Sequence, residues 1–146
     1  MLGKSISIPA KRKVVPVSRE FVGKNSTTFT DGEPVKIVAG VATPAGVTGE
    51  YAGYAIVDRQ TPKAFASGNE SAADGVKEFL LVALASPENE RVMATDGTLA
   101  TVGRFYKFDS AKKVDVSEGA QTTDAQVEVT EVISADFVKV RALQSK

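Results

Sequence analysis

Cysteine, histidine and tryptophan are all absent from this 146-residue chain. Without cysteine and histidine there are no disulfides, thiolate nucleophiles or imidazole bases, and nearly every zinc, copper or haem site is excluded. Without tryptophan the chain lacks the largest aromatic ring that could stack on a sugar. Catalysis would have to rely on Asp, Glu, Ser, Thr, Lys or Tyr. We therefore expect a binding protein with no enzymatic activity, no cofactor and no bound metal.

Long apolar runs are also missing. No stretch of about 18 apolar residues occurs, and Met1–Pro9 lacks the apolar core of a signal peptide. We expect no membrane association and synthesis in the cytoplasm of the producing cell.

Leucine and methionine are scarce, whereas β-branched residues are abundant. The chain has 6 Leu and 2 Met against 20 Val and 12 Thr. Branched side chains fit a pleated sheet better than a helix, and a chain of this length can bury a sizeable core. The composition predicts an all-β protein, a small barrel or sandwich of about seven or eight strands.

The net charge of zero conceals two unlike parts. Residues 1–30 carry six basic residues and one acid, a net charge of +5, so residues 31–146 carry −5. Pro9 and Pro16 cannot donate ladder hydrogen bonds. Large apolar residues lie along the second half of this part, namely Val14, Val15, Val17, Phe21, Val22 and Phe29. We expect an extended basic N-terminal arm over 1–30 that docks against protein, followed by a β-barrel body over 31–146.

Turn residues divide the body into short strands. Asp31-Gly32 predicts a tight turn, and residues 58–75 predict a projecting loop. Residues 76–85 satisfy both a buried strand and a helical spacing, and their shortness between Gly75 and Pro87 favours the strand. The alternating segments 126–133 and 136–143 predict a hairpin. Its expected core residues are Val127, Val129, Val138 and Val140.

Two other kinds of site can be weighed. The carboxylate pairs Asp31/Glu33 and Glu128/Glu131 could serve as a glycosidase dyad, but a turn and a strand surface explain them more simply. Basic residues 11–13 with the aromatic strand 104–108 could bind a nucleic acid. Alternation forces part of that aromatic set into the core, and the acidic body repels phosphate. Both alternatives are disfavoured.

Three segments carry a resemblance to a known family. They are residues 31–45 (DGEPVKIVAGVATPA), 103–114 (GRFYKFDSAKKV) and 138–143 (VKVRAL). Together they resemble the opening strand and loop, the central hairpin and the closing strand of the small β-barrel head decoration, or capsid cement, proteins of tailed bacteriophages. The basic arm and the insertion at 58–75 depart from that pattern.

The resemblance implies a structural virion protein on the outside of an icosahedral head. Its partners would be the major capsid protein and neighbouring copies of itself, as a homotrimer, and it would stabilise capsomer junctions. We expect the arm to make the contacts. The expected charged contacts are Lys11, Arg12, Lys13 and Arg19, and the expected apolar ones are Val14, Val15 and Phe21. A tail, baseplate or adhesion component is the alternative reading.

Overall fold

A computed structural model describes residues 17–47, 50–121 and 123–143. Among them lie twelve β-strands and one short 3-10 helix, η1, so the expected all-β class is confirmed. The elements, in chain order, are β1 (Ser18–Gly23), β2 (Thr28–Phe29), β3 (Pro34–Val38), β4 (Val41–Pro44), β5 (Gly53–Ile56), β6 (Lys63–Ala64), η1 (Asn69–Ser71), β7 (Phe79–Leu84), β8 (Arg91–Ala94), β9 (Phe105–Phe108), β10 (Val114–Asp115), β11 (Val127–Val132) and β12 (Phe137–Ala142).

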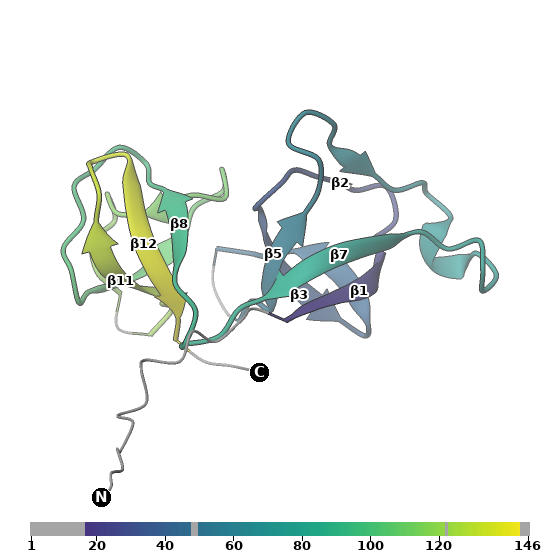
Figure 1. The fold of residues 1–146 in the computed structure, drawn as a ribbon, viewed down its shortest axis with the longest axis horizontal. Coiled ribbons are helices and arrows are strands. Elements are labelled where there is room, and N and C mark those ends of the chain that lie inside the picture. Colours follow the sequence, from purple (N-terminus) through teal and green to yellow (C-terminus); the bar gives the residue numbers. More distant parts are fainter. Residues whose placement is uncertain (1–16, 48–49, 122, 144–146) are drawn as a thin grey trace, which may run out of the picture.

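The first half of the described chain forms a small closed barrel. Its strand order is β1-β4-β3-β5-β7, and every neighbouring pair is antiparallel except the parallel pair β1–β4. The short pair β2–β6 lies at one end of it (Figure 1). A barrel this narrow is filled by its own side chains. These are Phe29, Val35, Ala42, Ala55, Phe65, Leu80 and Val82.

The second half forms a five-stranded sheet, here called the C-terminal sheet, with the order β10-β9-β11-β12-β8. Figure 1 shows it as a separate lobe beside the barrel. The predicted hairpin is confirmed, because β11 pairs with β12 and Val129 lies opposite Val140. All four expected core valines are fully buried. They belong to a second hydrophobic core, distinct from that of the barrel.

Residues 79–84 form a strand, as their shortness and flanking turns predicted. β7 pairs with β1 along one edge and with β5 along the other. Leu80 and Val82 point into the barrel core and are almost fully buried. The helical spacing in this segment is therefore incidental, because two-sided backbone pairing satisfies the chain better than an isolated turn of helix.

The arm boundary expected at residue 30 is corrected by the structure. β1 is hydrogen-bonded to β7 and β4, and Phe29 is fully buried in the barrel core. Phe21 and Phe29 do pack against protein, but the protein is their own chain. Without β1 the barrel would be left with two open edges on β4 and β7. Residues 31–146 are likewise not one barrel, since the strands after β7 build the C-terminal sheet.

The expected loop at 58–75 projects from the barrel (Figure 1), but hydrogen bonds hold its residues 69 and 70 against the rest of the fold. The buried Asn69 side chain donates to the carbonyls of Gly23 and Glu78, at 2.8 and 3.0 Å, and accepts from the Glu78 N–H. Asn25 and Glu70 exchange a further reciprocal pair of hydrogen bonds. Three polar side chains thus order a segment whose composition resembles a free loop.

Gly53 is required by the close approach of β5 and β7. A Cβ at this position would lie 2.1 Å from the Ala83 carbonyl oxygen, whereas a Cβ on Gly68 would meet nothing within 4 Å. We expect Gly53→Ala to lower the free energy of unfolding by about 3 kcal/mol or more, because backbone has to shift. Gly68→Ala should change it by less than about 1 kcal/mol. Urea unfolding followed by circular dichroism measures both, and equal losses would contradict the argument.

Candidate binding surfaces

The contact residues expected from the sequence fall into two groups. Lys11, Arg12, Lys13, Val14 and Val15 lie outside the described residues. The other two belong to β1. Arg19 is exposed, with its guanidinium carbon 5.6 Å from the centroid of the Phe21 ring. Phe21 is half-buried against the barrel core. Arg19 is thus accessible to a partner, whereas Phe21 has a structural role within its own chain.

Positive and negative charge are separated more completely when the chain is divided at residue 16 than at the expected arm boundary at residue 30. All 18 acidic residues lie in the described part of the chain, together with 13 of the 18 basic residues, which gives a net charge of −5. Residues 1–16, here called the N-terminal segment, carry four basic residues and no acid. An acidic folded body is therefore joined to a purely basic segment.

The carboxylate pairs considered as a dyad are engaged in ion pairs. Glu128 contacts Arg141 at 2.8 Å, and Glu131 contacts Lys139 at 3.3 Å. Asp31 contacts Arg59 at 3.6 Å and accepts the Val57 N–H. These contacts explain the carboxylates as parts of strand faces and turns.

The aromatic strand β9 alternates as expected. Tyr106 and Phe108 are buried, Phe105 is exposed and Lys107 is half-buried. The Lys107 ammonium lies 2.7 Å from the Glu118 carboxylate, which raises the pKa of the lysine. Lys107 is thus already paired, whereas Phe105 on β9 and Arg104 just before it are exposed.

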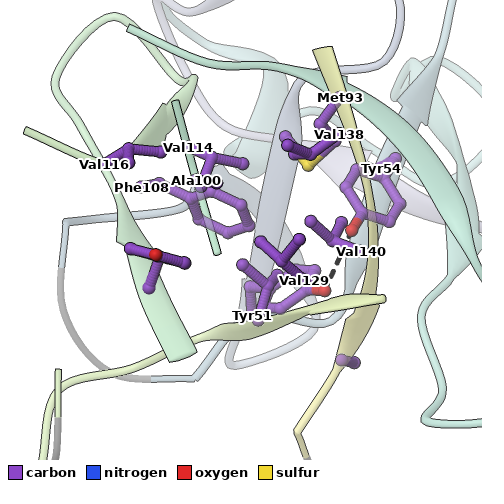
Figure 2. Packing of buried hydrophobic residues seen from close by; sticks show 13 residues of the cluster. Tyr51, Tyr54, Met93, Ala100, Phe108, Val114, Val116, Val129, Val138 and Val140 are labelled. Atoms are coloured by element: carbon purple, nitrogen blue, oxygen red, sulfur yellow. Dashed lines mark hydrogen bonds between the residues drawn. The ribbon is translucent and has the colours of Figure 1, made fainter. Parts of the chain in front are cut away.

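The barrel meets the C-terminal sheet through a buried aromatic cluster. Tyr51 packs edge-on against Phe108, with ring centroids 5.0 Å apart, and its hydroxyl shares a 2.9 Å hydrogen bond with that of Tyr54 (Figure 2). The Arg91 guanidinium lies over the Tyr54 ring at 4.3 Å. Burial raises the pKa of both tyrosines. Both hydroxyls therefore stay protonated, and one donates to the other.

A second contact between the two lobes is a partly buried ion pair. Glu33, buried before β3, accepts from the Thr30 N–H at 3.0 Å, and its other oxygen is reached by the Lys112 ammonium at 2.7 Å. Lys112 lies at the tip of the β9–β10 hairpin with φ of 67°. These groups and Arg91 line a cleft of about 270 Å³. Within the cleft Glu33 and Lys112 neutralise each other, and their ion pair joins the two lobes.

A groove of about 390 Å³ lies on the outer face of the barrel. Ile56, Phe79 and Leu81 are large apolar side chains that line it, and Glu20 and Asp58 are carboxylates on its margin. None of these residues was expected to form a site. The feature of the sequence that could have indicated the groove is the unbroken apolar run of β7, because alternate residues of a strand face outward when only one of its sides packs in a core.

Asp96 holds the loop after β8 against the segment after β10. Desolvation by itself would raise the pKa of its carboxyl group, but the N–H groups of Ser117 and Thr98 donate to it at 2.8 and 3.1 Å. These hydrogen bonds outweigh the desolvation and lower the pKa to about 2.

Lys112→Met should loosen the contact between the lobes. The change leaves the buried Glu33 carboxylate without its cation, which costs about 1–3 kcal/mol of unfolding free energy, a range that allows for the 38% exposure of the Lys112 side chain. The matched control is Lys113→Met, since Lys113 is exposed on the same hairpin. Urea unfolding at neutral pH compares the two, and equal stabilities for both variants would contradict a role for the ion pair.

Asp96→Asn should change how stability depends on pH. The folded pKa of about 2 lies below the ordinary value of 3.8, so the carboxylate stabilises the fold above about pH 5 and loses this effect as the pH falls through 4 towards 2. The wild type should exceed the variant in stability at about pH 7, and the excess should shrink towards pH 2 and disappear below it. Urea unfolding across this range measures the difference, with Asp74→Asn as an exposed control. A difference independent of pH would refute the assignment.

Comparison with known proteins provides no family for this chain. No protein-family model matches it, and a search of curated proteins finds no similar sequence. Among the described residues, no cluster of three or more Asp and Glu side chains is arranged to hold a metal ion. No helix in the described ranges is long and apolar enough to cross a membrane.

Proposed function

We propose that this protein is a structural component of a phage virion that binds the outer surface of the capsid and stabilises the junctions between capsomers. The observation that carries the proposal is the separation of charge between the basic N-terminal segment and a folded body of net charge −5. Opposite charges on one chain favour contact between neighbouring molecules in a repeating array.

Repetition compensates for weak individual contacts. A capsid presents many identical sites, so a contact of modest affinity is enough once each molecule engages more than one neighbour. An extended segment can gain backbone hydrogen bonds by adding a strand to an exposed sheet edge. Exposed ion pairs contribute at most about 1 kcal/mol each and weaken with salt. Apolar burial and strand addition therefore supply most of the retention.

The family resemblance supports the same proposal. Its three segments coincide with the β3–β4 hairpin, the β9–β10 hairpin and strand β12. On this proposal the partners are the major capsid protein and further copies of the chain as a homotrimer, and the location is the capsid surface. A tail or baseplate component would share the β-rich fold, and it differs in the particle that it binds.

Neutralising the basic cluster tests the proposal. The full chain should co-sediment with undecorated capsids assembled from the capsid protein of the same genome. Replacing Lys11, Arg12 and Lys13 by Gln should weaken binding by about tenfold at low salt, since three exposed pairs at a few tenths of a kcal/mol or more are lost. Point changes are preferred to deleting residues 1–24, because that deletion removes β1 and opens the barrel.

A matched control removes the same charge from the body. Lys24, Arg104 and Lys113 are exposed, and replacing them by Gln should leave binding within about twofold. If the wild-type chain remains in the supernatant with capsids but sediments with tail tubes, the capsid proposal is overturned in favour of the tail alternative.

A further inference from the structure

The groove on the barrel has an apolar floor that the folded body leaves uncovered. Ile56, Phe79 and Leu81 are 39%, 47% and 37% exposed. Strand register brings them together, because Leu81 on β7 lies opposite Ile56 on β5 and opposite Glu20 on β1. Three exposed large side chains on adjacent strands form a continuous patch, which is the usual mark of an interaction surface.

The margin of the groove is acidic. Glu20 and Asp58 are exposed, and neither forms an ion pair with any described residue. Lys63 also lines the groove, but its ammonium lies 2.7 Å from the Glu78 carboxylate and is neutralised there. The groove therefore offers an apolar floor between two unpaired negative charges.

The N-terminal segment has the complementary chemistry. It carries four basic residues and no acid, and Lys11-Arg12-Lys13 is followed directly by Val14-Val15. Sixteen residues of extended chain reach about 50 Å, enough to span to an adjacent molecule. Basic side chains can pair with the acidic margin while the valines cover the apolar floor.

We infer that this groove is the docking site for residues 1–16 of a second copy of the chain, so that each copy donates one segment and accepts another. The donor is a neighbour because of how the chain enters β1. The Val17 carbonyl accepts a hydrogen bond from the Leu84 N–H at 2.8 Å, so the chain enters β1 beside the last residue of β7. Phe79 of the groove is the first residue of β7, at the other end of that strand. To reach the groove of its own barrel, the segment of residues 1–16 would have to reverse its direction immediately before β1 and run back over that strand. The segment of a neighbouring copy needs no such reversal.

Such an arrangement is head to tail, with two different surfaces in each contact. Heterologous contacts of this kind close into rings or continue into open arrays. The inference rests on the proposed function and deepens it, because it names the surface through which copies on a capsid would link to one another.

Self-association of the full chain tests the inference. Sedimentation velocity over a concentration series should show reversible association, and a synthetic peptide of residues 1–16 should compete it away. The same peptide with Gln at positions 11, 12 and 13 should compete at least about threefold less well.

Groove variants of the full chain supply the second arm of the test. Glu20→Gln with Asp58→Asn keeps the Asp58 side-chain oxygen that accepts the Gln60 N–H, and it should raise the concentration for half-association at least about threefold. Leu81→Ser should raise the concentration for half-association at least about tenfold, with circular dichroism confirming that the barrel is folded.

Two control variants change exposed residues away from the groove. The double variant Glu88→Gln/Glu90→Gln matches the charge change, and Leu99→Ser matches the apolar one. Both should associate like the wild type.

Failure of the inference and failure of the proposed function can be told apart. A chain that stays monomeric at all concentrations, or one whose association survives both groove variants and excess peptide, overturns the groove assignment. If that chain still sediments with capsids, the proposed function stands without it. If the wild-type chain associates through the groove but does not bind capsids, the groove assignment stands and the proposed function falls.

Discussion

Strand β5 contributes side chains to both hydrophobic cores, and the relation between the two lobes depends on it. Ala55 points into the barrel and is fully buried there, whereas Tyr54, its neighbour in the chain, lies in the core of the C-terminal sheet. Successive strand residues point to opposite faces, so a single strand can serve two cores. The absence of a Cβ at Gly53 lets the same strand approach β7 closely enough to close the barrel.

The contacts around β5 turn two small sheets into one unit. Small cores are marginal by themselves, because a short chain buries a small fraction of its surface. Tyr51 and Tyr54 extend the core of the C-terminal sheet with rings that come from the barrel side. The Glu33–Lys112 ion pair adds a contact that fails if either partner is removed. The two lobes thus stabilise each other without a disulfide.

Charge and exposed apolar surface are distributed unevenly over the chain. The described body keeps seven of its 13 basic side chains in local ion pairs, while Glu20 and Asp58 form no ion pair beside an apolar groove. The chain's unopposed positive charge is concentrated in its first 16 residues. The proposed contact between copies rests on these two complementary features.

The sequence by itself determined the β class, the hairpin of β11 and β12 with its four buried valines, the strand at 79–84 and the excess of positive charge at the N-terminus. These follow from local rules, namely branched side chains, alternation and turn residues, which act within a few positions of one another. Where the basic segment ends and the barrel begins was decided by tertiary structure, because Phe21, Val22 and Phe29 contact strands that lie far away in the sequence: Val22 pairs with Val41 and Phe21 with Leu80. The same holds for the division into two cores and for the groove. Alternation shows that Phe79 and Leu81 share a face, but only the pairing of β7 with β1 and β5 brings Glu20 and Ile56 beside them.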